Sequence, residues 1–229
     1  MKNTNNIAVV YHYWAHYRES VVRHLCNQKN LGINYIFFSD KKSNNDIKTI
    51  DPNKANLNLT EGGLRWRFVR NYWISKNIMW QSGLIKLAFG KEFDAIIYLG
   101  QMYFISTWVS AIIARLTGKK VLMWTHGFIR EENNFKGWTR ALFYKLANGV
   151  LLYGNRARNI MIKKGFPPEK LYVIYNSLNY PEQKSIRDNI TDEECTRLKK
   201  ELFSQNKLPV LIFVGRLTPQ KKLDMLLKA

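Results

Sequence analysis

The sequence predicts an α/β fold: a Rossmann-like, doubly wound parallel sheet with helices on both faces. Short β-branched and aromatic runs alternate with helical stretches along the 229 residues. These runs are apolar throughout, which is typical of strands buried on both faces of a parallel sheet. Ligands of such sheets bind at the carboxyl ends of the strands, so candidate functional residues are sought there.

The first part of the chain contains six expected strands, at 7–11, 33–39, 93–100, 119–126, 149–154 and 170–177. Helical patterns separate them, at 19–29, 66–89, 106–116, 138–147 and 156–164. The stretch that follows, 176–189, is polar and lacks periodicity, so we interpret it as a linker.

A second domain is expected to begin after this linker. Thr191 is followed three residues later by Glu194, which is the pattern of a helix capping box, and the apolar run at 209–215 predicts a buried strand. The few elements predicted after the linker cannot form a sheet with a core of its own. We therefore expect an N-terminal Rossmann-like domain at 1–180 and the truncated start of a second one at 181–229.

The composition is that of a globular protein, with 46% hydrophobic residues. No apolar run reaches the roughly 18 residues of a membrane span, and the residues before the first strand do not resemble a signal peptide. Cys26 and Cys195 are expected to be reduced thiols rather than a disulfide. These features predict a cytoplasmic protein.

The net charge of +19 is large for this length. It favours an anionic partner, and the candidates are nucleic acid, the anionic face of a membrane and a phosphorylated substrate. A lysine-rich surface that only aids solubility is the simpler alternative, and charge alone does not choose among these partners.

The stretch GRLTPQKK, at 215–222, combines groups that suit a phosphate. Gly215 allows close approach of the backbone, Arg216 offers a planar fork to phosphate oxygens, and Lys221 supplies a compact charge near a helix start. The amino end of a helix adds partial positive charge. The alternative is an ordinary strand–turn–helix junction with surface lysines.

A second candidate is His126 in WTHGF, at 124–128, at the carboxyl end of an expected buried strand. Gly127 then lets the chain turn sharply. The position favours function because ligands of doubly wound sheets collect at strand ends. A histidine with a purely structural role is the alternative.

The first strand–helix turn carries Tyr17 and Arg18. Arg18 could bind an anionic group, or it could be an ordinary exposed helix residue. His12 and His16 lie in the same turn without acidic or thiol companions, so no metal site is expected.

Segment 62–91 is basic and rich in aromatic residues, with six lysines and arginines and no acidic residue. The spacing of its apolar residues predicts a helix that partly faces the core. The remainder suits contact with an anionic membrane surface or with single-stranded nucleic acid. Core packing with solvated arginines is the alternative.

The order of motifs resembles a known family. VIYNSLNY at 173–180, followed by LIFVGRLTPQKKLDMLLKA at 211–229, resembles the linker and second-domain start of retaining glycosyltransferases of family four, which have the GT-B fold. LLYGNRARNIMIKKGFPPEKLYVIYNS, at 151–177, looks like the last strand–helix–strand unit of their first domain. The resemblance spans essentially the whole chain and is strongest from 149 to 229. Two features depart from the family: Lys222 replaces its usual glycine, and the first turn lacks its glycine pair.

The resemblance implies an N-terminal acceptor-binding domain and a C-terminal domain that holds a nucleotide-sugar, with no metal or other cofactor. It implies that Arg216 and Lys221, next to Gly215, contact the donor diphosphate. His126 would be a catalytic residue that faces the donor sugar. Further donor or acceptor contacts would come from Tyr17, Arg18 and Gly127.

The implied activity is transfer of a sugar, with retention, to a saccharide or lipid-linked acceptor in cell-surface polysaccharide or lipopolysaccharide synthesis. The protein would work at the inner face of the cell membrane, with 62–91 as a peripheral contact. The family's paired glutamates have no counterpart in the 229 residues, so this chain alone is expected to transfer no sugar. The alternative hypothesis, a non-enzymatic basic module for nucleic acid or a membrane surface, explains the charge but not the order of motifs, so nucleic acid is the disfavoured partner.

Overall fold

A computed structural model describes residues 5–28, 32–43, 47–176, 179–203, 210–215 and 217–228. The chain divides into two units, Met1–Tyr180 and Pro181–Ala229, and each is described by itself.

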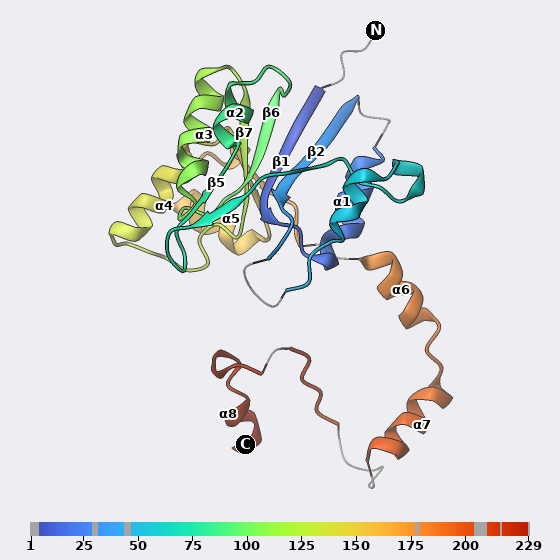
Figure 1. The fold of residues 1–229 in the computed structure, drawn as a ribbon. Coiled ribbons are helices and arrows are strands. Elements are labelled where there is room, and N and C mark those ends of the chain that lie inside the picture. The colour runs from blue at the N-terminus through green and yellow to red at the C-terminus, as the bar shows by residue number, and fades with distance from the viewer. Residues whose placement is uncertain are drawn as a thin grey trace. The chain divides into compact units, whose positions relative to one another are not determined.

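The first unit is built on a seven-stranded sheet in which all neighbouring strands run parallel (Figure 1). The strand order is β3-β2-β1-β6-β7-β8-β9, which confirms the predicted Rossmann-like α/β fold. The strands are β1 (Asn5–Tyr13), β2 (Ile33–Asp40), β3 (Trp66–Phe68), β6 (Ala95–Leu99), β7 (Lys120–Thr125), β8 (Gly149–Leu152) and β9 (Leu171–Val173).

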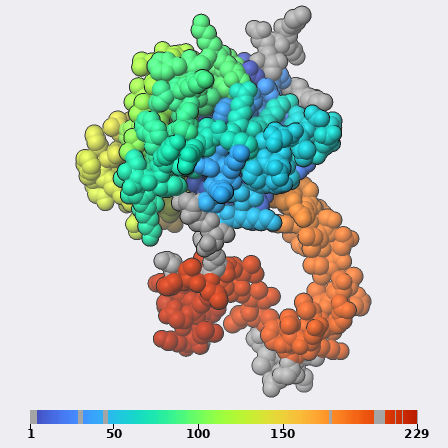
Figure 2. Space-filling model, viewed as in Figure 1, coloured from blue at the N-terminus to red at the C-terminus, as the bar shows by residue number. Residues whose placement is uncertain are grey.

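Helices cover both faces of this sheet. On one face, α1 (Glu19–Cys26) buries Val22 and Cys26 in a core cluster with Val9 and Phe37. The larger cluster on the other face is covered by α2 (Leu84–Phe89), α3 (Ile105–Leu116), α4 (Phe135–Lys145) and α5 (Asn155–Lys163). In the space-filling view, α3 and α4 (light green and yellow) lie at the surface on the same side of the first unit (Figure 2).

The prediction of a helix at 66–89 is wrong for most of that range. Trp66–Phe68 extends the sheet as β3, and a two-stranded antiparallel sheet follows, made of β4 (Asn71–Trp73) and β5 (Met79–Gln81). Only α2, after Gly83, is helical. Pairing with β2 lets the buried Trp66 indole donate a 3.1 Å hydrogen bond to Ser39 Oγ. This tertiary pairing outweighs the weak helix propensity of an aromatic-rich segment.

The remaining helices are α6 (Tyr180–Asp188), α7 (Asp192–Leu202) and α8 (Leu223–Lys228). The stretch predicted as a linker is helical over most of its length, as α6, and none of the residues of α6 is buried. Pro181 lies in its first turn, where a missing N–H costs little. The predicted capping box is confirmed, since Thr191 Oγ1 accepts from the Glu194 N–H and the Glu194 carboxylate accepts from the Thr191 N–H.

The strand predicted at 209–215 is not formed over the described residues 210–215. Ile212 and Val214 are 81% and 91% exposed there. An isolated strand leaves its backbone groups unpaired and its apolar side chains in water, so the apolar pattern alone is insufficient to form one.

Two further features concern the chain as described. Cys26 is buried and Cys195 is exposed, and both are free thiols as predicted. Within the described ranges, no helix has both the length and the apolar character needed to cross a bilayer.

Candidate functional site

A cavity of about 270 Å³ opens where β1, β6, β7 and β8 end. β1 lies between β2 and β6, so the winding of the chain reverses beside it, and ligands of doubly wound sheets bind at such a switch point. The cavity brings together the four candidate residues of the first unit, Tyr17, Arg18, His126 and Gly127.

His126 directly follows β7, and its ring lies beside the Tyr153 ring with the centroids 4.4 Å apart. Partial burial and, to a smaller extent, the positive charge of Arg18 lower the pKa of His126 below its usual 6.5. At neutral pH the imidazole is therefore uncharged, and it can donate one hydrogen bond and accept another.

Gly127 makes the turn that follows His126. Its φ of 64° lies in the left-handed region, and a Cβ at this position would lie 2.8 Å from Leu152 Cδ2 and 3.3 Å from Ala157 Cβ. Backbone conformation and available space therefore both favour glycine here.

Arg18 is half-buried among aromatic rings rather than being an ordinary exposed helix residue. Its guanidinium carbon lies 5.2 Å from the centroid of Trp124, 5.5 Å from that of Tyr11 and 5.8 Å from that of Tyr153. Its Nη2 donates a 2.9 Å hydrogen bond to Tyr153 Oη. None of the ion pairs found among the described residues involves Arg18, so its charge is available to an anionic ligand.

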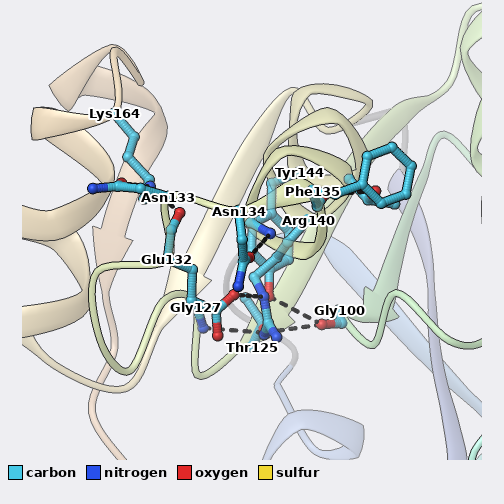
Figure 3. Close-up of polar contacts among 12 residues, drawn as sticks. Gly100, Thr125, Gly127, Glu132, Asn133, Asn134, Phe135, Arg140, Tyr144 and Lys164 are labelled. Carbon is cyan, nitrogen blue, oxygen red and sulfur yellow. Dashed lines mark hydrogen bonds and ion pairs between the residues drawn. The ribbon is translucent and has the colours of Figure 1, made fainter.

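A hydrogen-bond network joins the ends of β6 and β7 to α4 (Figure 3). Thr125 Oγ1 donates to the Gly100 carbonyl at 3.0 Å and accepts from the Gly127 N–H at 3.1 Å. The buried Tyr144 hydroxyl lies 2.9 Å from Thr125 Oγ1. The Thr125 side chain is thereby held by Gly100 and Tyr144, and it in turn holds the backbone N–H of Gly127 on the other side of His126.

The segment 128–134 between β7 and α4 is held at several points (Figure 3). Arg140 Nε lies 3.1 Å from Glu132 Oε2, and both side chains are largely buried. The contact lacks hydrogen-bond geometry, and neither atom has another hydrogen-bonding partner among the described residues. Lys164 Nζ donates to the Glu132 carbonyl at 2.7 Å, and Asn134 caps α4 by accepting from the Gly137 N–H.

The residues of this cavity that were not singled out as site residues from the sequence include these four: Tyr11, His12, Tyr153 and Arg140. Three of them lie at the ends of β1 and β8, so the strand-end rule was a usable signal. Arg140 lies in the middle of α4, and no local pattern of the sequence places it at the cavity.

His12 has an unusual environment within the cavity. Its Nδ1 is buried and has no hydrogen-bonding partner among the described residues. Burial first, and then the charge of Arg18, lower the pKa of His12 to about 4.

A second cavity of about 590 Å³ lies at the ends of β2 and β3. Cationic and aromatic side chains line it together: Lys41, Lys42, Arg70, Phe68 and Trp73. Lys41 Nζ lies 4.5 Å from the centroid of the Phe68 ring. Such a surface offers both charge and flat apolar faces to a ligand.

Asp40 connects, through hydrogen bonds, two of the segments that line the second cavity. Its Oδ1 accepts from the Lys42 N–H at 3.2 Å and its Oδ2 from the Asn71 N–H at 2.8 Å. Asn71 Nδ2 in turn donates to the His12 carbonyl at 2.7 Å, which links the second cavity to the first.

The expected diphosphate-binding residues belong to the second unit. Arg216 lies outside the described residues, whereas Gly215 and Lys221 are described. Lys221 ends a 3-10 helix, Pro219–Lys221, and Lys222 follows with a φ of 52°. This left-handed conformation strains a lysine and suits a glycine, the residue that the resembling family has at this place. The role of these three residues stays a prediction.

No cluster of three or more His, Cys, Asp or Glu side chains that could hold a metal ion occurs in the part of the chain that the structure describes. His16, one of the two histidines of the first turn, has its Nδ1 3.0 Å from the Lys48 carbonyl.

The fold and the position of its cavity define a class: a Rossmann-like α/β unit with a cavity at its switch point. No protein-family model matches the chain, and no curated protein matches its sequence. Solved structures do match it.

The chain is similar to a glycosyltransferase from Rickettsia africae, with 16% identity and a TM-score of 0.58 over 94% of this chain and 54% of that one. It is similar to HepE from Anabaena in complex with UDP and glucose, with 16% identity and a TM-score of 0.55 over 98% of this chain and 57% of that one. A UDP-N-acetylglucosamine 2-epimerase matches with 11% identity and a TM-score of 0.50 over 74% and 48% of the two chains. At these identities the likeness shows the fold alone, and the chain spans about half the length of these matches.

Proposed function

We propose that this chain is the acceptor-side part of a GT-B glycosyltransferase, which moves a sugar from a nucleotide-diphosphate-sugar to a saccharide or lipid-linked acceptor. The observation that carries the proposal is the convergence of Arg18, His126 and Gly127 in one cavity at the switch point of this fold. Similarity to a glycosyltransferase and to HepE in complex with UDP and glucose supports it. Retention rests on the resemblance of 149–229 to family four.

The reaction breaks the bond between C1 of the sugar and the diphosphate oxygen and forms a bond from C1 to the acceptor hydroxyl oxygen. The hydroxyl proton leaves with the departing diphosphate. Negative charge grows on that leaving group, and we assign its stabilisation to Arg216 and Lys221, next to Gly215, with no metal cofactor.

We assign orientation of the donor sugar to His126. Because its lowered pKa keeps the imidazole neutral, the ring contributes hydrogen bonds to sugar hydroxyls rather than a positive charge. We assign to Arg18, held by Tyr153 and two further rings, a positive charge in the cavity for an anionic group of the donor or acceptor. Tyr17 and Gly127 line the same cavity.

We place the acceptor in the second cavity, next to the first. Phe68 and Trp73 offer ring faces for a sugar, and Lys41 and Arg70 offer donors for its hydroxyl or acidic groups. We further propose that the protein acts in cell-surface polysaccharide or lipopolysaccharide synthesis, in the cytoplasm at the inner face of the membrane.

The test uses the protein as its own host makes it, incubated with radiolabelled UDP-, GDP- and ADP-sugars and with saccharide and lipid extracts of that host. Label should pass to an acceptor, and His126→Ala should lower the rate about 100-fold because a hydrogen bond made in the transition state is lost. His24→Ala, at an exposed position of α1 away from the cavity, is the matched control.

Other outcomes decide against the proposal. Conversion of a nucleotide-sugar into its epimer without any acceptor would indicate an epimerase on the same fold. Salt-dependent binding of single-stranded nucleic acid without sugar transfer would favour the basic binding module. An unchanged rate in His126→Ala would remove the role assigned to that residue.

A further inference from the structure

Two neighbouring helices of the first unit, α3 and α4, expose large apolar side chains. Leu116 is 82% exposed, Phe135 79% and Trp138 61%. The full set, here called the α3–α4 surface, is Ile105, Val109, Ile112 and Leu116 of α3 with Phe135, Trp138 and Leu142 of α4. Soluble proteins rarely leave so many large apolar side chains in water unless the surface has a partner.

The spacing of these residues makes one stripe on each helix. On α3 they recur at intervals of four, three and four residues, and on α4 at intervals of three and four, so each set lies along one helical face. That face of α3 is opposite the one that buries Ala111 and Ala114 in the core. Both stripes therefore point away from the sheet.

The two helices are seen on the same side of the first unit (Figures 1 and 2), and they contact each other at two points. The rings of Trp108 on α3 and Phe143 on α4 have centroids 4.8 Å apart. Nearer the carboxyl ends, Arg115 Nη1 donates a 3.2 Å hydrogen bond to the Leu146 carbonyl. These two contacts join the helices that carry the two halves of the α3–α4 surface.

The charges on the two helices themselves have one sign, whereas the exposed Glu131 lies just before α4, and Arg140 is paired with Glu132. Neither helix contains an acidic residue, and together they carry Arg115, Lys136, Arg140 and Lys145. Phe135 and Trp138 stack with their rings 5.8 Å apart. Apolar and aromatic side chains with lysines and arginines around them are typical of helices that lie in a membrane interface.

The charge of the two helices also indicates which kind of partner can bind to the α3–α4 surface. A second copy of the chain would bring like charges together, which is unfavourable at an interface. An anionic lipid surface attracts the same charges, by about fivefold in affinity for each lysine near the bilayer.

Segment 62–91 also exposes Ile74 and Phe89, but its tryptophans are less exposed than Trp138 of α4. Trp66 is buried, and Trp73 and Trp80 are partly buried, so the tryptophans of that segment are engaged within the first unit. Trp138 of α4, in contrast, is exposed and does not pack into the core.

We propose that the α3–α4 surface docks the protein onto an anionic phospholipid bilayer, with Phe135, Trp138 and Leu116 inserted among the lipids and the lysines at the headgroups. The inference depends on the proposed function only in naming a use for docking, which is delivery of a lipid-linked acceptor. Ile129 and Arg140 line the first cavity, so the segment before α4 and α4 itself connect this surface to the cavity.

The first experiment is sedimentation of the 229-residue chain with vesicles of 30% phosphatidylglycerol in phosphatidylethanolamine, and with phosphatidylcholine vesicles as the neutral comparison. Binding should be at least about tenfold tighter to the anionic vesicles. The double variant Phe135→Ser with Trp138→Ser should lose about tenfold in affinity. The matched control is Ile74→Ser, an equally exposed apolar position in 62–91, which should bind as the unchanged chain does.

The second experiment reverses charge. Lys136→Glu with Lys145→Glu should weaken binding to the anionic vesicles by more than about tenfold, whereas Lys76→Glu with Lys91→Glu, exposed positions in 62–91, should have a much smaller effect. Circular dichroism should show the same fold for all variants, because every altered side chain is exposed.

Four results would overturn the inference: no vesicle binding at all, a loss in Ile74→Ser as large as in the α4 variant, an equal loss in both charge reversals, and a dimer in solution that the α4 variant dissolves. Sugar transfer to a soluble acceptor is measured separately. Failure of docking with intact transfer, or the reverse, therefore tells the two proposals apart.

Discussion

At the scale of single residues, the clearest effect of the fold is that it lowers the pKa values of two histidines. His12 and His126 line the same cavity, and Arg18 lowers the pKa of both. Burial is the larger cause in each case. At neutral pH the cavity therefore contains two neutral imidazoles beside Arg18, whereas its other arginine, Arg140, is paired with Glu132.

His12 should make the protein sensitive to acid. Between its unfolded pKa near 6.5 and its folded pKa of about 4, only the unfolded state gains the proton, so stability is present above pH 6.5 and is lost as the pH falls. From pH 7 to pH 5 this loss is about 2 kcal/mol. His12→Phe should abolish it, as measured by urea unfolding at both pH values.

The control for this prediction is His24→Phe on the exposed face of α1, which should lose stability on acidification as the unchanged chain does. An acid-induced loss of the same size in His12→Phe would show that other groups dominate the acid response.

Arg18 should contribute to the lowered pKa of His126 through its charge. Arg18→Gln removes that charge, so the pKa of His126 should rise toward 6.5, while its partial burial keeps it below that value. The measurement is a titration of the His126 ring by NMR. Arg23→Gln, on α1 and away from the cavity, should leave the titration unchanged, and an unshifted His126 in Arg18→Gln would contradict the assigned coupling.

At the scale of elements, the segment between β7 and α4 depends on one largely buried ion pair. Glu132→Gln would leave Arg140 without its counter-charge, and we expect a loss of about 2 kcal/mol in the free energy of unfolding. Glu131→Gln is a close control, because Glu131 pairs with Lys163 on the surface and should contribute less than about 0.5 kcal/mol. Urea unfolding of both variants measures the difference; equal losses would mean that the buried pair does not hold this segment.

Elements with a strong local pattern were predicted well, and the others were not. The strands β1, β2, β6 and β7 and the helices α1, α3 and α5 lie close to the ranges predicted, because apolar runs and helical spacing are properties of neighbouring residues. Residues 66–81 contain short strands instead of a helix, because Trp66 pairs with a residue of β2 and Met79 pairs with a residue of β4. The partner of Trp66 is remote in the chain, and the partner of Met79 is reached only through a turn.

At the scale of the whole molecule, the 229 residues should lack activity on their own. The paired glutamates with which the resembling family contacts its donor have no counterpart here, so we expect no turnover of any nucleotide-sugar and a UDP dissociation constant of about 1 mM or weaker. Calorimetry and a radiolabel transfer assay measure the two quantities. Turnover by the purified 229-residue chain would refute this prediction.

By itself, the sequence determined the α/β class, the capping box at Thr191 and the strand-end candidates His126 and Gly127. All of these follow from local spacing and from the rule that strands of a parallel sheet end at one edge. Only the tertiary structure decided that Arg18 lies among three aromatic rings, that His12 is largely buried near it, and that α3 and α4 contact each other and both expose apolar stripes. The physical reason is that charge burial and surface continuity depend on residues far apart in the chain, and sheet pairing and helix packing are what bring them together.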